Sequence, residues 1–346
     1  MNVRTSLLGV LCAFALSPAA NAWDRGEATT FARLPPPKRN PEGIAVDAKT
    51  GNVYVADFDF RGTDSGVGQI LVFSKEGKLR RTINVAGSSP ALLGLDFHPT
   101  THALLVIDFG HHQVLSVDNL VTGASHLFMT ADPGSGLNAL TFDAGGNVYV
   151  SDSFEGKIWK TGPTGGAATV WVTDPLLTTT GDPPFGANGI AFNNEHNAMF
   201  VANTGNDTIV KIPVVDGVPG KPAVFTNSIN GADGLIIDED DNIWVCANQA
   251  DEIVVVDTTG KAIAKLGDFN GLSHGEPRGL LFPASLVFSG DSLLVTNLSL
   301  DLRLFDDGVT PTKQSVDSEW AAEVTTHTVA RIPRRLVHER HERHDR

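Results

Sequence analysis

The chain has 346 residues, a formal net charge of −14 and two cysteines, and 41% of its residues are hydrophobic. An acidic balance of this size argues against nucleic acid or an anionic membrane as the main partner. A chain of this length can bury a core large enough to fold without disulfides, and two cysteines are too few for a disulfide framework.

Residues 1–22 have the three parts of a secretory signal peptide. Arg4 supplies the positive start, residues 7–16 form the apolar stretch, and residues 20–22 read Ala-Asn-Ala, which is a small-residue cleavage site. We therefore expect a periplasmic or secreted protein that lacks a membrane anchor, because no later apolar run reaches about 18 residues. Cys246 lies within an apolar run and is expected to be a small buried hydrophobic residue.

Six copies of one strand-rich pattern follow the predicted signal. Each copy opens with a short strand, continues through a turn into a second strand rich in β-branched and aromatic residues, and then gives a third. The opening positions are 45 to 51 residues apart, close to the length of one four-stranded propeller blade. They are occupied by Glu42, Leu93, Asn138, Asn188, Asp233 and Ala284.

The later strands of each copy are less regular. Fourth strands are predicted at residues 79–85 and 168–172, for example, and the third strand of the sixth copy is predicted at residues 302–305. No segment shows helical periodicity. Six such copies are expected to close into a ring, because closure leaves only short edges exposed.

The sequence therefore predicts an all-β protein with one six-bladed β-propeller domain at residues 23–333. A strand at residues 28–34 or one at residues 324–332 would complete the last blade, and both remain open. Residues 334–346 contain three His-Glu-Arg or His-Asp-Arg triplets and are predicted to form a disordered tail, with transition-metal binding as the alternative.

The opening residues of different blades are expected to meet near the axis of the ring. Four of them carry side-chain oxygens: Glu42, Asn138, Asn188 and Asp233. Two carboxylates and two amides make an oxygen-only ligand set, which suits Ca²⁺ better than Zn²⁺. Turn formation is the alternative, because Asn-Gly and Asp-Gly are favoured turn pairs, although Glu has no such preference.

The opening segments resemble those of the regucalcin/gluconolactonase superfamily, which is related to paraoxonases and diisopropyl-fluorophosphatase. The similarity covers about residues 40–300, and it is carried by residues 41–43, 187–189 and 232–234 with the strands that follow them. The resemblance implies a six-bladed propeller with a divalent metal, usually Ca²⁺, in its central channel. It also implies a role for each polar opening residue, with Glu42, Asn188 and Asp233 as metal ligands and Asn138 as a ligand or a substrate contact.

The chain departs from this superfamily at three positions. Gly136 stands where regucalcin-type gluconolactonases carry Arg, and Leu93 stands where paraoxonases carry His. Gly234 follows Asp233, where paraoxonases have an Asp-Asn pair. The resemblance therefore supports the superfamily's fold and metal site in this chain better than it supports the superfamily's substrates.

These patterns predict a Ca²⁺-dependent hydrolase of small lactones or esters. The metal would polarise the substrate, and Asp233 would act as base or nucleophile. His274 is predicted as an additional proton carrier, with His111 or His112 as others, although each is also consistent with a surface-loop histidine. The polar residues that end the second strands are interpreted as turn caps: Asp57, Asp108, Asp152, Asn203, Asn248 and Asn297.

The alternative function is that of a non-catalytic scaffold. The blades also resemble NHL repeats, as at residues 51–57, and such repeats are often interaction modules. This alternative predicts a propeller that binds a protein, a polysaccharide or a small ligand. The sequence leaves the oligomeric state open under either hypothesis.

Overall fold

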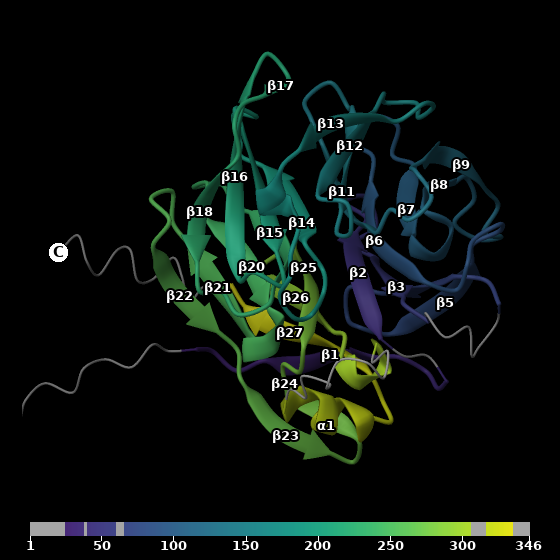
Figure 1. Cartoon of the computed structure of the whole chain (residues 1–346). Helices are drawn as coiled ribbons and strands as arrows, with labels where there is room; N and C mark the ends of the chain where they lie inside the picture. Colours follow the sequence, from purple (N-terminus) through teal and green to yellow (C-terminus); the bar gives the residue numbers. More distant parts are fainter. Residues whose placement is uncertain (1–24, 38–39, 60–65, 306–315, 335–346) are drawn as a thin grey trace, which may run out of the picture.

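The chain forms a six-bladed β-propeller, which confirms the predicted fold class (Figure 1). The computed structural model describes residues 25–37, 40–59, 66–305 and 316–334. The predicted signal segment and residues 335–346 of the predicted tail lie outside these ranges. Arg334, the first residue assigned to that tail, instead packs its guanidinium 4.1 Å from the ring of Phe288.

Each of the first five blades is an antiparallel sheet whose main strands pair in chain order, as the repeat predicts. The first comprises β2 (Pro41–Val46), β3 (Val53–Asp57), β4 (Gln69–Phe73) and β5 (Leu79–Asn84), and the second comprises β6 (Leu92–Phe97), β7 (Leu104–Asp108), β8 (Gln113–Val117) and β9 (Ser125–Thr130). The third comprises β10 (Leu137–Phe142), β11 (Val148–Asp152), β12 (Lys157–Thr161) and β13 (Thr169–Thr173). The fourth comprises β14 (Ala187–Phe192), β15 (Ala198–Asn203), β16 (Thr208–Val215) and β18 (Ala223–Asn227), with the short β17 (Val218–Pro219) against the end of β16. The fifth comprises β19 (Ala232–Ile237), β20 (Ile243–Ala247), β21 (Glu252–Val256) and β22 (Ala262–Leu266).

The sixth blade joins the two ends of the described chain. Its strand order is β25 (Pro283–Ser289), β26 (Ser292–Asn297), β27 (Thr328–Pro333) and β1 (Thr29–Arg33). Both strands that the sequence left open are therefore used, one as the third strand and the other as the outermost. The innermost strands β2, β6, β10, β14, β19 and β25 contact one another in a closed cycle, which completes the ring.

Residues 302–305 form the 3-10 helix η4 (Leu302–Phe305), so the third strand predicted there is wrong. Apolar residues alternate in this region, which is typical of a strand, but the side chains of Leu298, Leu300 and Leu302 instead line a central pocket. The chain returns to the sheet only after α1 (Val316–Ala322), a helix that the sequence patterns did not predict.

A two-stranded hairpin lies between the fifth and sixth blades. It is formed by β23 (Phe269–Ser273) and β24 (Glu276–Gly279), and it lies beside α1 in Figure 1. The rings of Phe269 and Trp320 pack edge to face with centroids 5.5 Å apart, which connects the hairpin to the helix. Three further 3-10 helices follow blade strands: η1 (Phe109–His111), η2 (Pro175–Leu177) and η3 (Asn248–Ala250).

The core lies between neighbouring blades. Every residue of β3, β7, β11 and β20 is buried, because both faces of a blade pack against adjacent blades and the second strand has a neighbour on each side. This explains why these strands read as nearly continuous apolar runs. Cys246 lies within β20 and is fully buried, as expected of a small hydrophobic residue.

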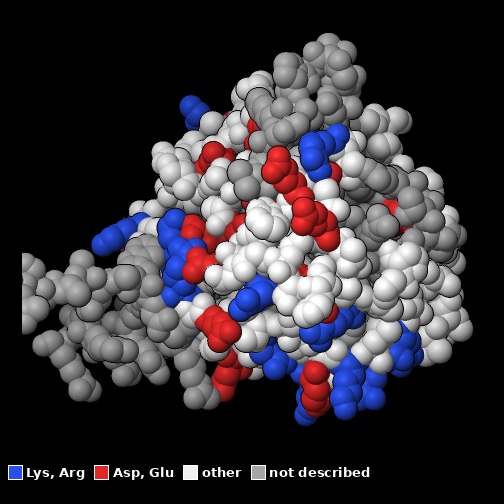
Figure 2. Space-filling view, turned by 90° about the horizontal axis from the view of Figure 1, so that it is seen from below, with Lys and Arg blue, Asp and Glu red and all other residues white. Residues whose placement is uncertain are grey.

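On the face shown in Figure 2, Lys and Arg side chains lie among Asp and Glu side chains. This mixture gives that face no uniformly basic surface of the kind that binds nucleic acid. Among the described residues, no helix is both long enough and apolar enough to cross a membrane.

Candidate metal centre

The opening residue of each inner strand lies at a break in strand register. In the first blade, Pro41 pairs with Asp57 and the next pair is Ile44 with Val55, so the irregularity falls at Glu42. Corresponding shifts occur in the other five blades. A β-bulge turns a side chain out of the regular alternation of its strand. This local feature directs the opening residues toward the channel.

The Asn-Gly and Asp-Gly pairs lie inside strands β14 and β19, so the alternative of turn formation is wrong. Glycine is needed for a different reason, which is the close approach of the next blade. A Cβ atom on Gly189 would lie 2.5 Å from the carbonyl oxygen of Asp233, and one on Gly234 would lie 2.5 Å from that of Ala284. Backbone contact between inner strands therefore requires glycine after Asn188 and after Asp233.

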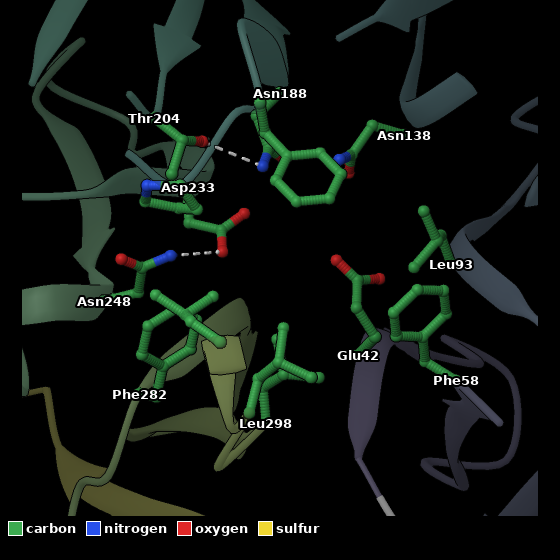
Figure 3. Close-up of a pocket in the computed structure, with 14 residues that line it drawn as sticks. Glu42, Phe58, Leu93, Asn138, Asn188, Thr204, Asp233, Asn248, Phe282 and Leu298 are labelled. Atoms are coloured by element: carbon green, nitrogen blue, oxygen red, sulfur yellow. Dashed lines mark hydrogen bonds between the residues drawn. The ribbon is translucent and has the colours of Figure 1, made fainter. Parts of the chain in front are cut away.

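The four predicted ligands line one pocket at the centre of the ring. Glu42 and Asp233 face each other across it, with Asn138 and Asn188 on one side (Figure 3). Each of these four residues is at most 5% exposed. The cavity has a volume of about 40 Å³, room for a few water-sized groups. The remaining lining residues are Phe58, Leu93, Pro183, Phe185, Thr204, Asn248, Phe282, Leu298, Leu300 and Leu302.

Both amide ligands are oriented by hydroxyl groups. The Nδ2 of Asn138 donates to Ser153 Oγ at 3.2 Å, and the Nδ2 of Asn188 donates to Thr204 Oγ1 at 3.0 Å. Ser153 Oγ in turn donates to the carbonyl of Ala187 at 2.7 Å, which leaves it to accept from the amide. With the nitrogens engaged in this way, the amide oxygens remain available to a cation.

The two carboxylates have buried oxygens without hydrogen-bond partners. Within the described part of the chain, Glu42 Oε2 and Asp233 Oδ1 have none, whereas Asp233 Oδ2 accepts from the Nδ2 of Asn248 at 3.0 Å. No described residue that lines the pocket is Lys, Arg or His. Buried charges without a partner are costly, so this arrangement calls for a bound cation.

Burial and mutual repulsion raise the pKa values of both acids. Burial raises the pKa of Glu42 well above its ordinary value, and the charge of Asp233 raises it further. Burial raises the pKa of Asp233 to about 7, against the opposing effect of hydrogen bonds from Asn248, Asn188 and the backbone of Gly234. Both shifts favour the protonated acids in the metal-free site, and a divalent cation would compete with those protons.

The donor set fits Ca²⁺. In the described residues, no group of three or more His, Cys, Asp or Glu is placed to bind a metal, so a site of the zinc type is not formed there. The pocket instead combines two carboxylates with amide oxygens, the hard ligands that Ca²⁺ prefers. The assignment of Glu42, Asn138, Asn188 and Asp233 as ligands stays a prediction that this geometry supports.

Asn248 has a role that sequence reasoning missed. It was grouped with the caps that end the second strands, but Ala247 is the residue that pairs with Ala232, as Asp152 pairs with Leu137. Asn248 is therefore one position further along and corresponds to Ser153 and Thr204, which hold the other ligands. An alignment of the blades by strand register would have revealed this equivalence.

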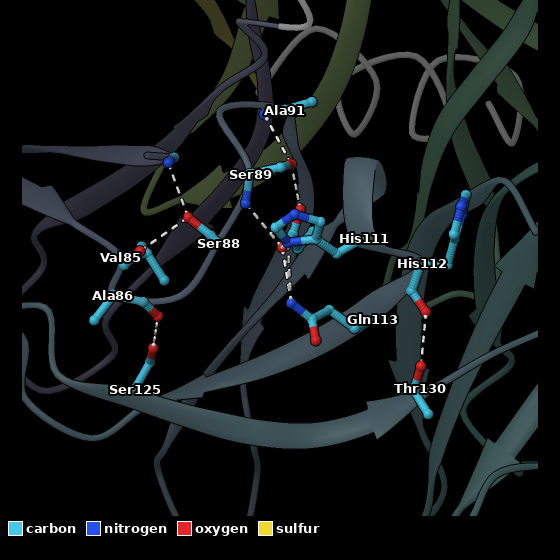
Figure 4. Close-up of polar contacts among 12 residues, drawn as sticks. Val85, Ala86, Ser88, Ser89, Ala91, His111, His112, Gln113, Ser125 and Thr130 are labelled. Atoms are coloured by element: carbon cyan, nitrogen blue, oxygen red, sulfur yellow. Dashed lines mark hydrogen bonds and ion pairs between the residues drawn. The ribbon is translucent and has the colours of Figure 1, made fainter. Parts of the chain in front are cut away.

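The capping interpretation fits Asp152, whereas Asp108 makes no side-chain cap bond to η1 and binds residues outside the turn that follows it. Asp108 accepts hydrogen bonds from the backbone N–H and the hydroxyl of Ser89 and from the side chain of Gln113. His111 Nδ1 lies 2.9 Å from the same carboxylate, and Figure 4 shows Ser89, His111 and Gln113 close together. Asp152 accepts from the backbone N–H groups of the loop that follows it.

The structure does not bring the predicted histidines to the pocket. His274 lies in the turn between β23 and β24 and lines a separate polar hollow with Thr29 and Arg33. His111 binds Asp108, as described above, and the Nδ1 of His112 lies 2.6 Å from the carbonyl of Ser135. The hairpin carries His274 away from the channel, so this geometry gives no support to a role for it as proton carrier.

Comparison with known proteins shows which family the chain resembles. Residues 98–267 match the SMP-30/gluconolactonase/LRE-like region. The matched part contains Asn138, Asn188 and Asp233 but not Glu42. Among solved structures, a gluconolactonase from Xanthomonas campestris shares the fold with a TM-score of 0.59 and 15% identity, over 82% of this chain and 96% of the other. The calcium-binding protein regucalcin from Agrobacterium tumefaciens does so with a TM-score of 0.60 and 16% identity, over 88% and 93%.

The chain also resembles a repeat protein in part of its sequence. It is 31% identical over 116 residues to NHL repeat-containing protein 3 of Mus musculus. The match covers 32% of this chain and 32% of the mouse protein. The resemblance of the blades to both groups was predicted from sequence and is confirmed.

Proposed function

We propose that this protein is a Ca²⁺-dependent hydrolase of small lactones or esters, exported to the periplasm or the medium. The observation that carries the proposal is the pair of buried carboxylates, Glu42 and Asp233, each with an unpartnered oxygen in one pocket. The fold shared with a gluconolactonase and with a calcium-binding protein supports it. The acidic net charge fits a small-molecule substrate better than nucleic acid.

Some residues of the pocket would bind the metal, and one of them would also take part in the reaction. Glu42, Asn138, Asn188 and Asp233 would hold the ion, which when bound polarises the carbonyl of an ester or lactone. Asn248 fixes the direction of the Asp233 carboxylate through Oδ2, which leaves Oδ1 directed elsewhere. Asp233 would then accept a proton from water or attack the carbonyl carbon itself. The apolar lining residues limit the water that reaches these groups.

The metal part of the proposal is tested by thermal unfolding. A ligand that binds only the native state stabilises it, so Ca²⁺ at about 100 times its Kd should raise the Tm by about 5 °C. Glu42→Gln and Asp233→Asn should abolish this shift. Glu76→Gln, at an exposed glutamate, is the matched control and should retain it. An unchanged wild-type Tm across Ca²⁺, Mg²⁺ and Mn²⁺ would refute the metal site.

The hydrolase part is tested by turnover. Wild-type protein should hydrolyse members of a panel of simple lactones and aryl esters, and a chelator should remove the activity reversibly. Asp233→Asn should lower kcat by at least about a hundredfold, the usual range for loss of an acid–base group. A panel that is uniformly inactive in the presence of Ca²⁺ would reject the hydrolase.

The partial identity to an NHL repeat-containing protein favours a second function, that of a non-catalytic binding propeller. In that case the ion would have a structural role only. Calcium-dependent stability without hydrolysis of any panel member would be the expected result.

A further inference from the structure

The central pocket has a polar half and an apolar half. One residue from each blade follows the second strand and lies beside the opening residue of the same blade. In the third, fourth and fifth blades these residues are Ser153, Thr204 and Asn248, and all three bind opening residues through their side chains. In the sixth, first and second blades the equivalent residues are Leu298, Phe58 and Phe109.

The opening residues follow the same division. They are Asn138, Asn188 and Asp233 in the third to fifth blades, and Ala284, Glu42 and Leu93 in the other three. In Figure 3, Thr204, Asp233 and Asn248 lie on one side of the hollow, Phe58 and Leu93 lie on the opposite side, and Leu298 and Phe282 lie at its lower edge. Glu42 is the polar exception within the apolar half.

The segment that follows β26, residues 298–302, adds three leucine side chains to the apolar half; we call it the leucine segment. Leu298, Leu300 and Leu302 line the pocket and are each at most 8% exposed. Two of their backbone polar groups are bonded to residues that do not line the pocket. The carbonyl of Leu298 accepts from Asn40 Nδ2 at 2.8 Å, and the N–H of Leu302 donates to Ser318 Oγ at 3.1 Å. The leucine segment therefore presents mainly carbon to any ligand.

Aromatic rings close another part of the wall. Phe185 lines the pocket, and its ring lies 5.7 Å from that of Phe154. Phe154 covers Gly136, where an added Cβ would lie 2.7 Å from the ring. A longer side chain that could form hydrogen bonds does not fit at position 136 unless it displaces that ring. The pocket therefore receives the ring of Phe185 from the segment before β14, while Phe154 packs against that ring from outside the pocket.

We propose that this site selects compact lactones or esters that carry apolar substituents, and that it discriminates against polyhydroxylated ones. This inference rests on the proposed hydrolase function. The carbonyl end would lie toward Glu42, Asp233 and the amides, and the substituent toward the leucine segment. A hydroxyl group placed there would lose its hydration without gaining a partner, which is unfavourable. The small size of the pocket favours a compact substrate.

The comparison of two six-membered lactones tests this selectivity. δ-Hexalactone carries one methyl group, whereas glucono-1,5-lactone carries several hydroxyl groups on the same ring. Each kcat/KM is divided by the rate of uncatalysed hydrolysis at the same pH, which removes the difference in intrinsic reactivity. We expect the normalised value for δ-hexalactone to be at least about a hundredfold higher. An equal or higher value for glucono-1,5-lactone would overturn the inference and leave the hydrolase intact.

Substitution of apolar residues that line the pocket, here called wall residues, is the second experiment on selectivity. Leu298→Asn should lower the selectivity ratio by about tenfold or more, whereas Leu127→Asn, at a leucine that is 54% exposed on β9, should leave it unchanged. Phe185→Asn is a second wall variant, because this ring is only partly buried and its loss is better tolerated by the fold. The selectivity is measured only on variants that retain a cooperative thermal transition. Unchanged selectivity in both folded wall variants would contradict the role assigned to the wall.

Binding of non-hydrolysable lactams separates this inference from the proposed activity. 6-Methyl-2-piperidone and glucono-1,5-lactam match the two substrates in shape, and their Kd values are measured by calorimetry with Ca²⁺ present. At least about tenfold tighter binding of the methyl lactam, lost in Leu298→Asn, would support the selectivity even if no lactone were hydrolysed. Equal affinities, or no binding of either lactam, would reject it.

Discussion

Asn248 donates a 3.0 Å hydrogen bond to Asp233, and this contact helps to orient one of the two carboxylates of the central pocket. The donor begins η3 directly after β20, while the acceptor lies at the bulge that opens β19. Both residues are at most 4% exposed. The pair therefore depends on the register of two neighbouring strands in one blade.

Removal of this contact should weaken metal binding more than it weakens the fold. Asn248→Ala leaves Asp233 Oδ2 without its donor, and loss of such an orienting partner typically lowers metal affinity by about 10- to 100-fold. Calorimetric titration with Ca²⁺ measures the change. Asn297→Ala is the matched control, because Asn297 binds Gly279 and Leu281 and does not line the pocket. Equal loss of affinity in both variants would show that the effect is general destabilisation.

The metal-free protein should become less stable as pH rises. The pKa of Asp233 is about 7 in the folded state and 3.8 as its ordinary value, so the folded state binds more protons between these pH values. The free energy of unfolding then falls as pH increases from about 4 and through 7. Urea unfolding in the presence of a chelator between pH 5 and 8 measures this slope. In Asp233→Asn the slope should be smaller, and an unchanged slope would contradict the assignment.

Gly234→Ala should destabilise the junction between the fifth and sixth blades. The added Cβ would lie 2.5 Å from the Ala284 carbonyl oxygen, so the inner strands must separate, at a cost of about 1–3 kcal/mol in the free energy of unfolding. Gly162→Ala is the control, because nothing lies within 4 Å of a Cβ there and the residue has no positive φ. Chemical unfolding should show little change or a slight gain for this control. Two variants of equal stability would argue against tight packing at the ring.

Cys246 should be unreactive toward thiol reagents in the native protein. It is fully buried in β20, and burial raises the pKa of its thiol, with smaller contributions from Asp233 and Glu42. A chain that starts at residue 23 should release about one equivalent of thionitrobenzoate from Ellman's reagent in 6 M guanidinium chloride and almost none without it. Rapid release from the folded protein would indicate that the fifth blade opens.

The sequence predicted the blades well because each blade is a local unit. Its strands pair in chain order, so β-branched runs and turns at regular spacing define it without information from elsewhere in the chain. The ring residues Glu42, Asn138, Asn188 and Asp233 were found in the same way, since each marks the start of a repeat. Closure at one axis then brought them together.

The errors arose where structure depends on partners that a local pattern does not identify. Leucines at 298, 300 and 302 alternate like a strand, yet they cover a pocket, because β27 occupies the place beside β26. Asn248 was assigned one position out of register, because the residue that ends the second strand and the residue that binds the opening residue are adjacent in the third, fourth and fifth blades. His274 was predicted near the channel only because histidine can carry protons. The direction of the β23–β24 hairpin decides where it lies, and that direction is away from the channel.

The placement of β1 beside β27 has a consequence for biogenesis. The two strands are about 300 residues apart in sequence, and the sixth sheet lacks its two outer members until both are available. A nascent chain can form early blades, but it cannot seal the circle before its last strand has been synthesised. Such non-local pairing slows folding. A delay of this kind would leave the ring open until β27 has been synthesised and has paired with β1.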